Sequence, residues 1–171
     1  ATKVVPVLSG GDPITNAGAI TYNNTSGNTW TAAYTAHTND TDGVVTYSIV
    51  VGDLAGNPGT AVTTGSGSVT FDKTAPTLSS ASIASDTSPA THANPGDVVT
   101  VTLAASVAIS QPVVTFKSGG NAVSDGSITY AGSGANWTAA YTAGASDTEG
   151  AVSFTIAYSD LAGNAGTNVT S

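Results

Sequence analysis

The sequence has no cysteine, no methionine and no arginine, and charged side chains make up only 8% of its 171 residues. Without cysteine, disulfide bonds and thiolate metal sites are excluded. The basic side chains are Lys3, Lys73 and Lys117, against 11 acidic ones, which gives a formal net charge of −8. Three lysines neutralise too few phosphates for binding to nucleic acid or to an anionic membrane, so we expect neither partner.

Long hydrophobic runs are missing as well. No apolar stretch reaches the roughly 20 residues that a membrane-spanning helix requires, and no signal peptide is recognisable. We therefore expect no membrane insertion, and without an initiator methionine we interpret the chain as a mature or excised piece. An acidic chain with few bases is suited to divalent cations as partners. The alternative is that the acids only provide solubility.

The chain does contain an internal repeat. The heptapeptide WTAAYTA at 30–36 recurs at 137–143, and DLAGN at 53–57 recurs at 160–164, both at a shift of 107 residues. Between 30–63 and 137–170, 21 of 34 ungapped pairs are identical. A period of this length is the size of a small domain and too long for a solenoid unit. The sequence therefore predicts tandem modules, an organisation typical of proteins that set length, spacing or adhesion.

Apolar residues alternate with Thr and Ser almost throughout, which predicts half-buried antiparallel strands and no helix. In the second module, turn signals separate seven expected strands, near 77–84, 98–104, 112–117, 127–131, 136–142, 151–159 and from about 166. Seven short strands in about a hundred residues are typical of an immunoglobulin-like sandwich with antiparallel Greek-key connections, and a closed barrel is the alternative. We expect Trp30 and Trp137 to anchor the two cores.

The module boundaries predict two incomplete domains. Residues 1–71 form a partial immunoglobulin-like module, because Val4 and Val5 align with the third strand of the second module and leave strands A and B absent. Residues 72–171 form the second module, which lacks the end of its last strand. Either the chain is an arbitrary cut from a longer repeat protein, or another chain supplies the missing strands, as in donor-strand polymers.

Aspartates are expected to meet at the junction of the two modules. In a sandwich, consecutive strands alternate in direction. The loop after the fifth strand therefore lies at the end where the chain leaves one module, and the loop before the last strand lies at the end where it enters the next. Carboxylates from these two loops and from the linker therefore converge at the junction. Because calcium takes six to eight oxygen ligands, the sequence predicts a calcium site there. The candidate ligands are Asp40, Asp42, Asp72 and Asp160.

The alternative reading is that these acids only shape turns. Asp40 and Asp42 would then form the turn after the fifth strand, and Asp53 and Asp160 would fix hairpins through side-chain-to-backbone hydrogen bonds. Lys73, beside Asp72, favours this alternative because it neutralises a neighbouring acid. None of the spacings matches an EF-hand loop.

The motif FDKTAP at 71–76, together with DLAGN and the DT(D/E)G turns at 40–43 and 147–150, resembles bacterial immunoglobulin-like repeats of large secreted adhesins and other cell-surface proteins. The resemblance covers essentially the whole chain. It implies an extracellular location, rigid stalks and stiffening by calcium at or near module junctions.

The first functional hypothesis is therefore an extracellular spacer, extender or filament-forming unit of an adhesin-type protein, with neighbouring copies or adjacent repeats as partners. The alternatives are a subunit of a donor-strand-complemented, pilus-like polymer, and an accessory module that binds a surface glycan, a receptor or another ligand. We expect no enzymatic activity, since His37 and His92 belong to no nucleophile elbow or zinc motif.

Overall fold

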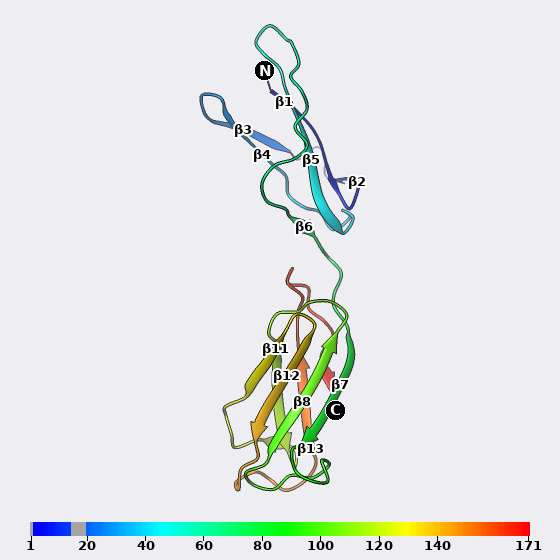
Figure 1. The fold of residues 1–171 in the computed structure, drawn as a ribbon, viewed down its shortest axis with the longest axis vertical. Coiled ribbons are helices and arrows are strands. Elements are labelled where there is room, and N and C mark those ends of the chain that lie inside the picture. The colour runs from blue at the N-terminus through cyan, green and yellow to red at the C-terminus, as the bar shows by residue number, and fades with distance from the viewer. Residues whose placement is uncertain (1, 15–19) are drawn as a thin grey trace. The chain divides into compact units, whose positions relative to one another are not determined.

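A computed structural model describes residues 2–14 and 20–171. All the secondary structure elements assigned within these residues are β-strands (Figure 1). The predicted all-β class and antiparallel pairing are thus confirmed. The chain divides into two compact units, Ala1–Thr74 and Ala75–Ser171, which we call unit 1 and unit 2 and describe separately.

Unit 2 contains two four-stranded antiparallel sheets, with the orders β10-β9-β13-β14 and β11-β12-β8-β7. The strands are β7 (Leu78–Ser85), β8 (Val98–Ala105), β9 (Val113–Ser118), β10 (Asn121–Ala122), β11 (Thr129–Ser133), β12 (Asn136–Thr142), β13 (Val152–Ala157) and β14 (Val169–Thr170). The seven predicted strands are all present, and the sequence reading missed only the short β10.

The core of unit 2 lies between its two sheets. On β8, Val99, Val101 and Leu103 are at most 3% exposed, whereas the intervening Thr residues face outward, as the period of two predicts. Across the core, the ring centroids of Phe116 on β9 and Tyr141 on β12 are 4.7 Å apart. Two sheets that share one apolar core are consistent with a β-sandwich.

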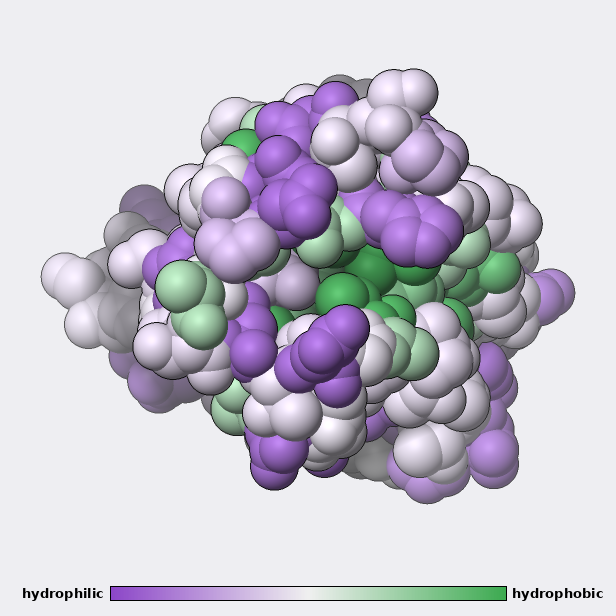
Figure 2. Space-filling view, turned by 90° about the horizontal axis from the view of Figure 1, so that it is seen from below, coloured by the Kyte–Doolittle hydropathy of each residue, from purple (hydrophilic) through white to green (hydrophobic). Residues whose placement is uncertain are grey.

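The core of unit 2 also reaches the surface at one end. Figure 2 looks onto that end and shows apolar side chains in a hollow, surrounded by polar ones. Val98, at the start of β8, is 36% exposed, and Val152, at the start of β13, is only partly buried. The loops at this end leave part of the apolar interior open to solvent.

Unit 1 contains one four-stranded antiparallel sheet, with the order β2-β1-β5-β6, and a separate hairpin, β3-β4. Its strands are β1 (Thr2–Ser9), β2 (Asp12–Pro13), β3 (Thr21–Ser26), β4 (Thr29–Ala33), β5 (Gly43–Val51) and β6 (Thr70–Phe71). Val62 and Pro58 extend the sheet further through isolated bridges to Ile49 and Gly52.

Among the residues whose burial is described, unit 1 has far fewer buried apolar side chains than unit 2. Among its residues whose burial is described, Ile14 is the one buried hydrophobic side chain. Every residue of β3 and β4 is exposed, and Trp30 on β4 is 48% exposed. The prediction that Trp30 anchors a core is therefore wrong. Among the described residues β4 pairs with β3 alone, whereas its counterpart β12 pairs with both β11 and β8. Trp137, the counterpart of Trp30, is half-buried and packs against the core of unit 2.

Candidate functional site

In each unit an aspartate closes the turn between two strands, β4 and β5 in unit 1 and β12 and β13 in unit 2. In unit 1, Asp40 Oδ2 accepts a hydrogen bond from His37 N at 2.8 Å, and Asp40 N donates to His37 O at 2.9 Å. In unit 2, Asp147 Oδ2 accepts from Gly144 N at 2.9 Å, and Asp147 N donates to Gly144 O at 3.1 Å. Hydrogen bonds from Gly144 and Ser124 hold the pKa of Asp147 below its ordinary value.

The DLAGN loops carry a second repeated arrangement. Asp53 accepts from Asn57 N and from Asn57 Nδ2, both at 2.8 Å, and Asp160 accepts from Asn164 N and Nδ2, both at 2.9 Å. The bonds from Asn57 lower the pKa of Asp53. For Asp160, burial acts to raise the pKa, but the bonds from Asn164 and the loop backbone outweigh it and the pKa is lowered.

Two further acids of unit 1, Asp42 and Asp72, accept hydrogen bonds from the segment that follows β6. Asp42 Oδ1 accepts from Lys73 N at 3.2 Å, and Asp42 Oδ2 accepts from the hydroxyl of Thr74. Asp72 Oδ1 accepts from Thr74 N at 3.0 Å. Lys73 Nζ donates to the carbonyl oxygens of Thr38 at 2.9 Å and Asp40 at 2.7 Å. The lysine ammonium therefore binds the turn that carries Asp40.

Three of the four predicted calcium ligands thus belong to neighbouring loops of unit 1, whereas Asp160 belongs to a hairpin loop of unit 2. Within residues 2–14 and 20–171, no three His, Asp or Glu side chains gather closely enough to hold a metal ion. The hydrogen bonds of Asp40, Asp53 and Asp160 to loop backbone are those expected if these acids shape turns. The calcium site itself stays a prediction. The sequence reading considered Lys73 only as a neutraliser of Asp72 and missed its contact with Thr38 and Asp40.

The two histidines make local contacts. His37 Nδ1 accepts from Asn39 N at 3.2 Å, within the turn that Asp40 closes. His92 Nδ1 lies 3.0 Å from the hydroxyl of Thr91. Both rings therefore help to shape the loops in which they lie.

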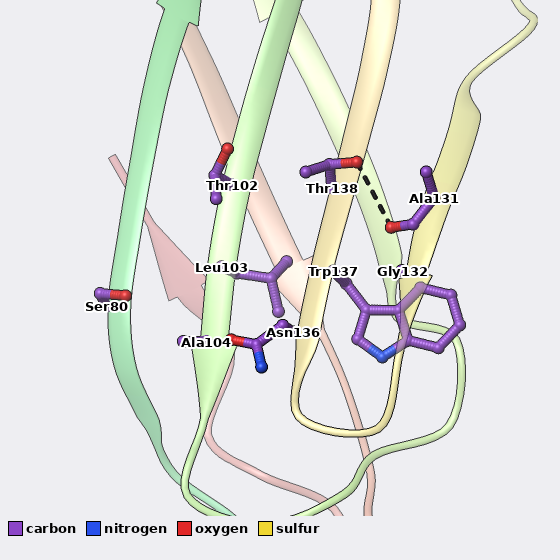
Figure 3. Close-up of a pocket in the computed structure, with 9 residues that line it drawn as sticks. All are labelled: Ser80, Thr102, Leu103, Ala104, Ala131, Gly132, Asn136, Trp137 and Thr138. Carbon is purple, nitrogen blue, oxygen red and sulfur yellow. Dashed lines mark hydrogen bonds between the residues drawn. The ribbon is translucent and has the colours of Figure 1, made fainter.

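A shallow, open groove crosses the sheet of unit 2 that contains β8 and β12 (Figure 3). Its lining combines small polar residues, small or apolar residues and one aromatic ring. The Thr138 hydroxyl donates to Ala131 O at 3.3 Å. The indole of Trp137 donates to Gly134 O at 3.1 Å. The lining residues are Ser80, Thr102, Leu103, Ala104, Ala131, Gly132, Asn136, Trp137 and Thr138.

The outer edge of β4 lies where the sequence analysis expects strands A and B to be absent. One edge of β4 pairs with β3, in a register that places Tyr22 opposite Ala32. No strand among the described residues pairs with the other edge, which we call the open edge. Its matching strand in unit 2, β12, pairs with β8 along seven consecutive residues.

No protein-family model, curated protein or solved structure matches this chain. In the part of the chain that the structure describes, no helix is long and apolar enough to cross a membrane. The contacts within each unit therefore carry the functional argument.

Proposed function

We propose that this chain is an extracellular structural segment, in which immunoglobulin-like repeats in series act as a spacer, extender or filament-forming unit of an adhesin-type cell-surface protein. The observation that carries the proposal is that the two units repeat the same local architecture, at a shift of 107 residues for β4 and β5 and of 109 residues for β2. The sheet orders correspond in three strands, since β2-β1-β5 in unit 1 matches β10-β9-β13 in unit 2.

The loop bonds correspond as well. The pair Asp53–Asn57 in unit 1 matches Asp160–Asn164 in unit 2, with the same two side-chain hydrogen bonds. The backbone bridge between Ile49 and Val62 likewise matches the pairing of Ile156 with Val169. Because these bonds join side chains and backbone of the same unit, each loop keeps its shape without a ligand. A repeated unit of this kind suits a spacer, whose length depends on copy number.

Fused copies of residues 1–171 test this proposal. We expect the maximum dimension of one, two and four fused copies, measured by small-angle X-ray scattering, to rise in proportion to copy number. A compact chain would instead grow roughly as the 0.38 power of its length. Growth of that compact kind would overturn the spacer role.

We also propose that calcium binds near the acidic loops of unit 1 and stiffens the junction, with Asp40, Asp42, Asp72 and Asp160 as ligands. Asp42 and Asp72 support this proposal because both contact Thr74, which brings their carboxylates together. The Lys73 ammonium competes with it by binding the carbonyl oxygens of Thr38 and Asp40.

A thermal melt in millimolar calcium and in EDTA tests the calcium proposal. We expect calcium to raise the melting temperature, and we expect the double variant Asp42→Asn, Asp72→Asn to abolish the rise. The double variant Asp86→Asn, Asp97→Asn, which removes the same two charges within unit 2, is the matched control and should keep the rise. Identical melting curves in calcium and in EDTA would overturn the proposal.

A further inference from the structure

The segment that follows β6 is bound to a turn of its own unit. Lys73 Nζ donates to Thr38 O at 2.9 Å and to Asp40 O at 2.7 Å. Lys73 N and the Thr74 hydroxyl donate to the two carboxylate oxygens of Asp42. Four hydrogen bonds therefore join two successive residues of this segment to one turn, and we call this set of contacts the latch.

The latch uses a charged group on each side. The Lys73 ammonium donates to two carbonyl oxygens, and the Asp42 carboxylate accepts from two donors. Hydrogen bonds to ionised groups are shorter and stronger than those between neutral groups. Thr74 N also donates to Asp72 Oδ1 at 3.0 Å, which fixes the backbone within the segment. The chain is therefore held in place up to Thr74.

Unit 2 holds the chain again from Pro76 onward. Pro76 is buried. Thr77 N donates to Ser106 Oγ at 3.0 Å, and Ser106 N donates to Thr77 O at 2.8 Å. Strand β7 begins at the next residue and pairs with β8. Ala75 is exposed, takes part in none of these hydrogen bonds, and alone separates the two fixed segments.

We propose that the latch reduces the joint between the two units to a single free residue, Ala75, and that Lys73 and Thr74 are the positioning residues of a stiff joint. Each residue contributes two soft torsions. Those of Ala75 are narrowed further, because a residue before proline is disfavoured in the α region. The ring of Pro76 fixes the next φ.

This inference deepens the spacer role and rests on it. Domains of one chain move relative to each other by default unless a large apolar interface joins them. A joint of one residue restrains that motion through the backbone itself. The latch uses only groups of unit 1, so the restraint requires no partner and no metal ion.

Pulsed electron paramagnetic resonance tests the joint, since the chain has no natural cysteine. Spin labels at Thr46→Cys on β5 and Thr102→Cys on β8, both exposed positions, give the distribution of distances between the units in EDTA. The reference is the same chain with Gly-Ser-Gly inserted after Ala75, which raises the number of free residues from one to four. Because the reach of a flexible linker grows as the square root of its length, we expect the insertion to widen the distribution about twofold. Equal widths with and without the insertion would overturn the stiff joint.

The double variant Lys73→Met, Thr74→Val tests the latch. It frees residues 73–75, so we expect the distribution to widen by roughly 1.7-fold, the square root of three. The control is Lys117→Met, Thr115→Val, which makes the same two changes at exposed positions of β9 and should keep the original width. A latch variant as narrow as the unsubstituted chain would overturn the role of the two residues.

Hydrogen exchange of the β5 amides shows whether unit 1 stays folded in the latch variant. Should β5 lose protection there, Thr74→Val alone, which keeps both charged groups, decides by the same comparison of widths. The spacer role and the joint fail separately. Proportional growth of the fused copies with a distribution as wide as that of the insertion variant would keep the spacer role and overturn the joint. Compact growth with a narrow distribution would overturn the spacer role alone.

Discussion

Individual carboxylates in this protein act mainly as acceptors for backbone N–H groups. Asp147 accepts from the backbone of Ser124 and Gly144, and Asp125 accepts from Ser127 at 2.9 Å and Thr142 at 3.0 Å. These hydrogen bonds favour the ionised form and lower the pKa of both groups. An asparagine cannot replace such a residue, because its amide nitrogen donates where a carboxylate oxygen accepts.

Asp147→Asn should therefore destabilise unit 2 by about 1–2 kcal/mol at neutral pH, through the loss of one charge-assisted hydrogen bond. The folded-state pKa of Asp147 is lowered, so its contribution is present above the unfolded-state pKa of about 3.9 and is lost as pH falls through the folded-state value. Urea unfolding between pH 7 and pH 2 checks this. The wild-type and variant curves should converge below about pH 4.

Glu149→Gln removes one charge from the same turn and serves as the control for Asp147→Asn. We expect its urea midpoint to follow that of the wild type across the pH range. A constant gap between Asp147→Asn and wild type down to pH 2 would contradict the assigned role of the carboxylate.

Pairs of turns, rather than single turns, define one end of each unit. The Ser-Gly-Gly turn after β9 lies against the turn that ends at Gly150, and Ser118 donates to Thr148 O at 2.8 Å. A Cβ atom at Gly150 would lie 2.9 Å from the Cα of Gly119, and the φ of Gly150 is +142°. Unit 1 has the same contact between Gly43 and Gly10. Both the backbone conformation and the space require glycine.

Gly150→Ala should destabilise unit 2 by about 1–3 kcal/mol, because alanine is strained at this φ and its methyl group meets backbone that cannot move aside. Differential scanning calorimetry checks the change. Gly126→Ala is the control, since a Cβ atom there meets nothing within 4 Å. A Gly150→Ala variant as stable as Gly126→Ala would show that the two turns separate easily.

The strands were predictable because alternation is a local property. Val99, Val101 and Leu103 show the period of two that buries one face of β8, and the turn signals bound the strand. The burial of that face depends on residues far away in the sequence. Trp30 and Trp137 lie in identical heptapeptides, but of the two only Trp137 packs against a core. Lys73 escaped prediction for the same reason, because its carbonyl partners precede it by more than 30 residues.

The two units of the chain differ in the number of buried apolar side chains among the residues whose burial is described. Unit 2 has a core of 12 buried apolar residues, whereas Ile14 is the one buried hydrophobic side chain among the residues of unit 1 whose burial is described. Since apolar burial is the main favourable term in folding, the two units should differ in stability. We expect unit 1 to unfold at a lower denaturant concentration than unit 2.

Leu103→Ala tests whether the two units unfold independently. The substitution should destabilise unit 2 by about 2–5 kcal/mol, because Leu103 is 1% exposed and its removal leaves a cavity. Hydrogen exchange followed by mass spectrometry should show faster exchange in β8, β12 and β13 of the variant. The amides of β1 and β5 should exchange as they do in the wild type. Equal acceleration in both units would show that the chain unfolds as one cooperative body.

The exposed β3–β4 hairpin also makes the two halves of the chain unequal substrates for digestion. Proteases cleave backbone that is accessible and locally open, and β4 presents Trp30 where unit 2 encloses the matching segment. Limited proteolysis should therefore cleave the β3–β4 hairpin before any strand of unit 2.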